Sequence, residues 1–124
     1  MGSTAARMSA RVALCWAACC AFLFPTDADA TPTYVVDIRP IFERSCYGCH
    51  GPEKQRSKYR LNVRATALKG GSSGAAAIVP HDPTNSPLFR NVSGEDPDML
   101  MPPKSSGIPA LTADEVELIR AWND

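Results

Sequence analysis

The chain has 124 residues and equal numbers of acidic and basic side chains, 13 of each. This length provides for one domain, and the balanced charge gives no general electrostatic attraction to nucleic acid. We therefore expect one small domain with no nucleic-acid partner.

The first thirty residues have the pattern of an export signal. Arg7 and Arg11 precede the apolar run VALCWAACCAFLF, and ADA at residues 28–30 is a small-x-small cleavage site. A basic start, a short apolar stretch and such a site are typical of a secretory signal peptide, and the run is too short to remain as a membrane span. We predict a signal peptide at residues 1–30 and a domain at residues 31–124, in the periplasm or otherwise exported.

Two alternatives to simple secretion stay open at this point. The stretch WAAC places small residues before Cys19, as in a lipoprotein signal, but Trp16 stands where such a signal has an aliphatic residue. The second alternative is an apolar run that stays uncut as a membrane anchor. Simple secretion is the preferred interpretation, and it removes every cysteine except Cys46 and Cys49.

Residues 37–46 are expected to form the first helix of the domain. Asp37 is a candidate N-cap, and Pro40 falls in the first turn, where its missing N–H costs little. Helical spacing places four residues on one face of this helix: Ile38, Ile41, Phe42 and Ser45.

Four basic residues then alternate along the chain: Lys54, Arg56, Lys58 and Arg60. The ordinary interpretation is a solvated extended loop. The more specific interpretation is a surface that docks an acidic partner, or a source of cations that pair with carboxylates buried nearby.

The middle of the chain is expected to consist of loops and short helices. Asn62 is a candidate cap for a helix that runs to Lys69 and stops at Gly70. The loop GGSSG lacks the Gly-Lys-Ser/Thr that completes a phosphate-binding loop, so we reject nucleotide binding. Ser86 followed by Pro87 is a typical helix start, and residues 94–110, rich in proline, are expected to be irregular.

The helix expected after Leu111 has the clearest sequence signals. Thr112 and Glu115 have the spacing of a capping box. An apolar stripe follows at helical spacing: Leu111, Val116, Ile119 and Trp122. The whole pattern predicts a small all-α domain with little regular core of its own.

The stretch SCYGCH carries the chemistry of the domain. A zinc site needs four ligands, and besides Cys46 and Cys49 only His50 and His81 offer nitrogen donors. A redox dithiol needs its cysteines at a helix start after a strand, whereas this pair follows a helix. Two thiols at this spacing can add to the vinyl groups of a haem, with the following histidine as proximal iron ligand. We therefore predict one covalently bound haem c.

The ligand on the far side of the iron is less directly indicated. Met101 is the first candidate, because Pro102 and Pro103 make a stiff extended segment that presents its thioether. An open site or His81 ranks second, since VPHDP is more typical of a surface turn. Met99 ranks last, because it has the opposite phase in an extended chain.

Together these motifs resemble the cytochrome c superfamily, and specifically the planctomycete-type cytochrome c domain. The resemblance rests on DIRPIFERSCYGCHGPEKQ, RLNVRATALKGGSSGAAAIVPHDPTNSPLFRNV, DMLMPP and LTADEVELIRAWND. It implies a class I cytochrome c-like fold with its first and last helices packed together around the haem, and Phe42 and Trp122 near their crossing. It also implies the site residues: thioethers at Cys46 and Cys49, and iron ligation by His50 and Met101. One departure is His81, which stands where the family leads us to expect glycine.

We expect an exported domain that carries single electrons between redox partners, alone or as the haem module of a larger protein, and that is not an enzyme. The expected partner is a redox protein, with an acidic surface if the basic residues dock it, and no stable membrane insertion follows signal cleavage. The alternative is a small-ligand sensor or peroxidase-like module whose distal site is open or holds His81. A further alternative is a binding or scaffolding domain in which the haem is chiefly structural.

Overall fold

The computed structural model describes residues 30–124. Within this range the chain forms helices and turns joined by loops, and it contains no strand, so the predicted all-α class is confirmed. The predicted signal peptide and its two alternatives fall on residues that lie outside the described range, apart from Ala30. Among residues 30–124, no helix has both the length and the apolar character needed to cross a membrane.

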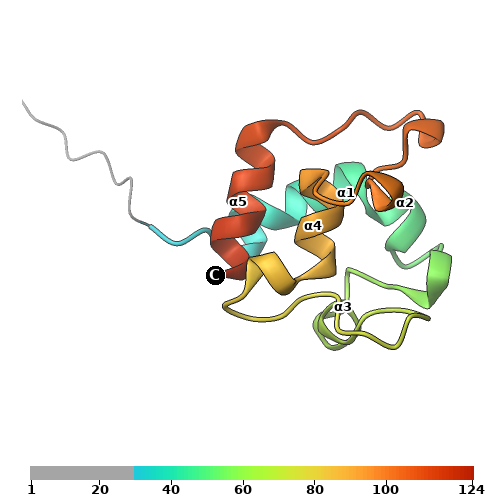
Figure 1. Cartoon of the computed structure of the whole chain (residues 1–124), viewed down its shortest axis with the longest axis horizontal. Helices are drawn as coiled ribbons and strands as arrows, with labels where there is room; N and C mark the ends of the chain where they lie inside the picture. The colour runs from blue at the N-terminus through green and yellow to red at the C-terminus, as the bar shows by residue number, and fades with distance from the viewer. Residues whose placement is uncertain (1–29) are drawn as a thin grey trace, which may run out of the picture.

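Five α-helices organise the described part of the chain (Figure 1). They are α1 (Arg39–Ser45), α2 (Tyr47–His50), α3 (Arg64–Lys69), α4 (Pro87–Ser93) and α5 (Ala113–Asn123). Shorter turns connect them: η1 (Tyr34–Ile38), η2 (Arg56–Lys58), η3 (Pro83–Asn85), η4 (Pro97–Met99) and η5 (Lys104–Ser106). α5 packs against α4 and η1, while α3 lies away from this group, at the lower end of the view in Figure 1.

The first helical segment begins earlier than predicted. The π-helical turn η1 precedes α1, and Asp37 lies inside this turn instead of at the N-cap. The Asp37 carboxylate accepts hydrogen bonds from the Thr33 backbone N–H at 2.7 Å and the Thr33 hydroxyl at 3.2 Å, so it satisfies donors at the helix start from within. The four residues predicted to share a face are all buried: Ile38, Ile41, Phe42 and Ser45.

The helix predicted from Asn62 is present as α3, but its cap is different. α3 begins after Val63, which makes no side-chain cap. The Asn62 Oδ1 atom instead accepts a hydrogen bond from Nε of Arg60 at 2.7 Å, so it is not free to cap. The stop at Gly70 is confirmed, because Gly70 follows Lys69 with φ of +90°, a conformation that glycine adopts readily.

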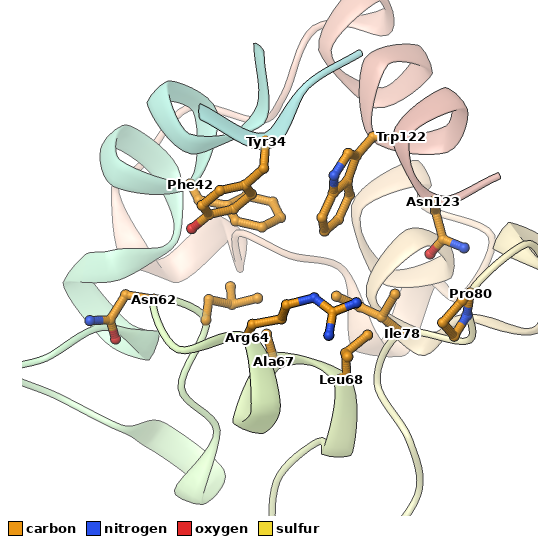
Figure 2. A pocket seen from close by; sticks show the side chains of 11 residues that line it. Tyr34, Phe42, Asn62, Arg64, Ala67, Leu68, Ile78, Pro80, Trp122 and Asn123 are labelled. Carbon is orange, nitrogen blue, oxygen red and sulfur yellow. The ribbon is translucent and has the colours of Figure 1, made fainter. Parts of the chain in front are cut away.

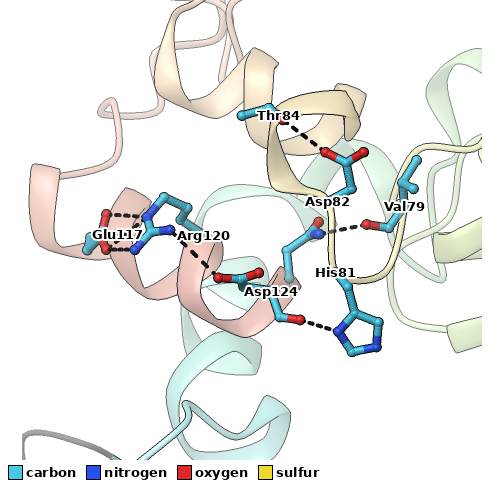
Figure 3. A network of polar contacts seen from close by, with 8 residues as sticks. Val79, His81, Asp82, Thr84, Glu117, Arg120 and Asp124 are labelled. Carbon is cyan, nitrogen blue, oxygen red and sulfur yellow. Dashed lines mark hydrogen bonds and ion pairs between the residues drawn. The ribbon is translucent and has the colours of Figure 1, made fainter.

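The start of α4 lies where it was predicted, although Ser86 acts differently. Ser86 precedes Pro87, but its buried hydroxyl accepts a hydrogen bond from the Val79 N–H at 2.8 Å and caps nothing. The Val79 carbonyl accepts a second bond at 2.8 Å from Nδ2 of Asn123 in α5, drawn as a dashed line in Figure 3. Val79 thereby connects the beginning of α4 with the end of α5.

α5 carries the predicted capping box. The Thr112 hydroxyl accepts a hydrogen bond from the Glu115 N–H at 3.2 Å, and the Glu115 carboxylate accepts one from the Thr112 N–H at 2.9 Å. The same carboxylate pairs with Arg44 of α1 at 2.7 Å. The start of α5 is therefore stabilised locally and is also held against the first helix.

Three aromatic rings join the two ends of the described chain. The rings of Phe42 and Trp122 lie 6.0 Å apart, edge to face at 87°. Tyr34 lies 6.4 Å from Phe42 and 5.9 Å from Trp122. Such pairs contribute about 0.5–1.5 kcal/mol each beyond the burial of their area. The expected contact between Phe42 and Trp122 is confirmed.

Candidate haem site

A single helical turn gathers the residues of the SCYGCH motif. Cys46 donates its N–H to the carbonyl of Phe42 at 2.8 Å, which closes α1. The Cys46 carbonyl then accepts from the N–H of Cys49 at 3.1 Å and from that of His50 at 2.8 Å, which forms α2. Residues spaced three and four apart share a helix face. The two thiols and the imidazole therefore start from the same side of this turn.

The environment of Cys46 suits a buried attachment point better than a redox dithiol. Burial raises the pKa of the Cys46 thiol to about 12, Arg44 opposes this rise, and Cys49 adds to it. A dithiol catalyst needs a thiol with a lowered pKa, because the thiolate is its nucleophile. Cys46 has the opposite character.

His50 has the properties of a metal-binding imidazole. Its Nδ1 atom is buried and has no hydrogen-bond partner among the described residues. Burial lowers the pKa of the imidazole, and the backbone carbonyls of Tyr59 and Arg56 partly oppose this effect. The neutral imidazole is the form that ligates metals, and a buried polar atom without a partner carries a free-energy cost. The residues of the motif therefore fit a covalently attached haem.

The loop after the motif folds back over His50. The Leu61 N–H donates to the His50 carbonyl at 2.8 Å, and the Tyr59 ring lies 5.5 Å from the imidazole. In the stretch between His50 and Tyr59, Ser57 and Lys58 both have φ of 55°. Left-handed backbone is uncommon for residues other than glycine and costs on the order of 1–3 kcal/mol each. Neighbouring structure must hold this loop in place.

Gly71 is the residue against which the loop rests. The Ser72 N–H donates to the Ser57 carbonyl at 2.7 Å. A Cβ atom at Gly71 would lie 2.3 Å from that carbonyl oxygen and 3.0 Å from the Cβ of Tyr59. Only glycine allows this close approach, and the approach fixes the segment that covers His50.

We expect Gly71→Ala to displace this segment and to change the surroundings of His50. Overpacking of this kind costs roughly 1–3 kcal/mol of the free energy of unfolding, measured by denaturant titration of the haem-loaded protein. The absorption spectrum and the reduction potential should change with it, because His50 is the predicted iron ligand.

Gly74→Ala is the matched control for this substitution. Gly74 has φ of +76°, and a Cβ atom there would have no neighbour within 4 Å, so alanine adds backbone strain without contact. It should cost about 1–2 kcal/mol and leave the spectrum unchanged. Identical spectra for both variants would show that Gly71 does not position His50.

Met101 and Met99 have different environments. Met101 is partly buried and packs against the same hydrophobic cluster as Cys46, and its N–H donates to the Asn91 carbonyl at 3.0 Å. Met99 is 50% exposed. The expected extended segment is wrong in detail, because residues 101–102 lie in a bend. Of the two methionines, Met101 is the one that lies toward the core.

His81 lies in an exposed turn, as its sequence context predicted. Its φ is 63°, a left-handed backbone conformation that glycine adopts more readily than histidine. Its N–H donates to the Asn123 carbonyl at 2.8 Å, and its Nδ1 contacts the Asp124 carbonyl oxygen (Figure 3). The side chain is therefore engaged at the end of α5.

A largely apolar cavity of about 440 Å³ lies beside the motif. Phe42 and Leu61 line it, and their backbones are hydrogen-bonded to Cys46 and His50 respectively. Figure 2 shows aromatic side chains on one side of the cavity and residues of α3 on the other: Tyr34, Phe42 and Trp122 face Arg64, Ala67 and Leu68.

The cavity does not include the four predicted site residues. Its lining residues adjoin the motif through the backbone, whereas these four side chains lie outside its wall: Cys46, Cys49, His50 and Met101. The sequence analysis did not identify Leu61 or Arg64 as site residues, since neither has a side chain with distinctive chemistry at a motif spacing.

The zinc interpretation finds no support in the described residues. Within residues 30–124, no three side chains of the His, Cys, Asp or Glu type are grouped as they would be around a metal ion. A structural zinc site would need four ligands.

The comparison with known families agrees with the site. The model of the planctomycete cytochrome C family matches residues 46–105, a range that contains both cysteines, His50 and Met101. No curated protein and no solved structure matches the chain. Proteins of the cytochrome c family generally transfer electrons and bind haem covalently. Residues 46–105 thus carry a planctomycete cytochrome C domain, the family that the sequence motifs predicted.

Proposed function

We propose that this protein is an exported c-type cytochrome that carries single electrons between redox partners. One haem would be bound through Cys46 and Cys49, and His50 and Met101 would ligate its iron. The observation that carries this proposal is the single turn that sets both thiols and the His50 imidazole on one side of the chain. The buried Nδ1 atom of this imidazole has no hydrogen-bond partner among the described residues.

The residues of the chain have separate tasks in this function. A bound haem supplies the one-electron redox chemistry, and a histidine and methionine ligand pair raises its potential relative to two histidines. Cys46 and Cys49 fix the position of the group, and the loop over His50 fixes the imidazole. Met101 would supply the second protein ligand of the iron.

The fold and the location belong to the same proposal. Contact of the first and last helices through Phe42 and Trp122 supports a class I cytochrome c-like fold around the haem. The basic start and apolar run support a signal peptide at residues 1–30 ahead of a domain at residues 31–124. Haem attachment would then take place after export, in the periplasm.

The test is expression of the full chain together with a haem-maturation system. We expect haem to stay attached after denaturation, and we expect spectra of a six-coordinate iron in both oxidation states. The reduced protein should not bind carbon monoxide readily. Loss of haem on denaturation would refute covalent attachment, and rapid carbon monoxide binding would favour the sensor or peroxidase-like alternative.

A docking surface for an acidic partner is the second part of the proposal. Lys54, Arg56 and Lys58 are exposed near His50 and form no ion pair among the described residues. The arginines that do form ion pairs with glutamate lie elsewhere: Arg39, Arg44 and Arg120. The unpaired cations therefore remain available to steer a partner of opposite charge.

Replacing Lys54, Arg56 and Lys58 together with glutamine should slow electron exchange with a purified acidic redox protein. We expect about a tenfold loss in the second-order rate constant at low ionic strength, and a weaker dependence on salt, measured by stopped flow. The control removes three cations elsewhere: Lys69, Arg90 and Lys104. Equal losses in the two triple variants would show that net charge, and not this surface, determines the rate.

A further inference from the structure

The apolar cavity beside the motif has the size of a small-molecule site. Its volume of about 440 Å³ falls within the range of roughly 300–1,000 Å³ that is typical of ligand pockets. None of the four residues proposed to hold the haem lines it: Cys46, Cys49, His50 and Met101. The cavity is therefore a second space, which lies next to the predicted attachment site and is not part of it.

One buried polar atom in the lining of this cavity has no partner. Asn123 is only 4% exposed, and its Oδ1 accepts no hydrogen bond from the described residues. In Figure 2 this oxygen points toward the cavity side. A buried acceptor without a donor costs free energy, because it has given up its hydrogen bonds to water. A molecule that completes the cavity therefore has to bring a hydrogen-bond donor to Asn123.

The position of this acceptor is fixed by hydrogen bonds on both sides. The Nδ2 atom of Asn123 donates to the Val79 carbonyl at 2.8 Å, and the Asn123 carbonyl accepts from the His81 N–H at 2.8 Å. Two other side-chain oxygens line the cavity, those of Tyr34 and Asn62, and both already have hydrogen-bond partners. Asn123 thus presents the one side-chain oxygen of this lining that lacks a partner among the described residues.

The walls of the cavity favour an aromatic ring as the occupant. Figure 2 shows the rings of Tyr34, Phe42 and Trp122 on one side and α3 on the other. Arg64 of α3 is the charged residue of the lining, and its guanidinium lies across from Trp122. Aromatic edges and guanidinium groups both make favourable contacts with the face of an aromatic ring. A single ring fits easily, because an apolar cavity of about 150 Å³ already admits benzene.

We propose that the cavity is a binding site for a small neutral phenol, a molecule with one aromatic ring and one hydroxyl donor. The ring lies between the aromatic wall and α3, and the hydroxyl donates to Oδ1 of Asn123. A phenol ionises only near about pH 10, so it keeps its donor proton at neutral pH. This binding goes beyond electron transfer and does not depend on it, because no electron or proton is exchanged.

The first experiment compares two ligands that differ in the donor, added to the haem-loaded full chain at neutral pH. The probes are para-cresol and its methyl ether, which accepts hydrogen bonds but donates none. We expect para-cresol to bind about tenfold more tightly by isothermal titration calorimetry, because the ether leaves Asn123 without a donor. Equal affinities would overturn the proposal, since a water would then satisfy Asn123. Absence of binding would also overturn it, since the haem or other groups would then fill the space.

Two alanines of α3 test whether the ligand lies in this cavity. Ala67 lines the cavity, whereas Ala65 is exposed and does not line it. Ala67→Leu should fill part of the space and weaken the binding of para-cresol by about tenfold or more. Ala65→Leu adds the same side chain to the same helix and should bind para-cresol like the wild type. Equal affinities in the two variants would overturn the location.

Asn123→Leu tests the hydrogen bond itself. Leucine is close to asparagine in size but has no acceptor, so this variant should bind para-cresol and its methyl ether equally well. A preference for para-cresol that persists in this variant would overturn the role of Asn123. The substitution also removes the bond to Val79, so circular dichroism checks that the variant folds. If it does not fold, the two ligands on the wild type and the alanine pair still decide the proposal.

The outcomes for this site and for the proposed function are distinct. Covalent haem without discrimination between the two ligands would overturn only the phenol site. A chain that carries no covalent haem but still prefers para-cresol would overturn the proposed function and leave the phenol site in place.

Discussion

Replacement of Met101 with alanine should turn the reduced haem protein into a rapid binder of carbon monoxide. Met101 is the methionine that packs against the same cluster as Cys46, and alanine has no atom with which to ligate iron. We also expect the reduction potential to fall, because a thioether ligand raises it. Stopped-flow mixing with carbon monoxide and a redox titration measure the two effects.

Met99→Ala is the matched control for this prediction. Met99 lies two residues earlier in the same loop and is 50% exposed, so its loss should leave carbon monoxide binding and the potential as they are. His81→Gln should likewise change neither quantity, because His81 is held at the end of α5. The opposite result would contradict the prediction: if Met101→Ala bound carbon monoxide slowly and a His81 variant bound it rapidly, His81 would be the ligand.

Replacement of Cys46 and Cys49 together with serine should abolish covalent haem attachment. Serine hydroxyls do not form thioether bonds, so any haem bound through His50 would be lost when the protein is denatured and extracted with acidified organic solvent. Mass spectrometry of the polypeptide and the extracted fraction measures the attachment directly. Haem that remains on the double variant after denaturation would contradict the assignment of these cysteines.

The two single variants serve as internal controls for this experiment. Cys46→Ser and Cys49→Ser each keep one thiol on the same helical turn, so each should retain one thioether and a shifted spectrum. If one of them bound haem like the wild type, the attachment would depend on one cysteine alone. The proposal requires that both contribute.

Sequence signals correctly predicted those features that depend only on residues close together in the chain. The capping box of Thr112 and Glu115 and the stop of α3 at Gly70 depend only on neighbouring residues, and both are present. The buried face of the first helix followed from spacing alone, because a helix that packs on a core needs an apolar stripe. The SCYGCH motif also needs one turn of backbone to place its side chains.

Features that depend on distant partners were not predictable in the same way. Asn62 is a good cap by type, but Arg60 occupies its oxygen. The left-handed backbone at Ser57 and Lys58 is imposed by contact with the Gly71 segment, and neither residue type indicates it. The cavity lined by Arg64 of α3 and Trp122 of α5 likewise arises only in the folded chain, since sequence spacing carries no information on how these distant segments come to share it.

The contact of Phe42 with Trp122 has a consequence for biosynthesis. These rings come from opposite ends of the described chain, so the aromatic cluster cannot form until α5 has been synthesised. Until then the apolar face of α1 lacks its partner, and the nascent chain exposes it to water and to other proteins. The chain therefore stays incompletely folded during synthesis until α5 has been made. A chain shortened before Trp122 should remain a substrate for chaperones and proteases.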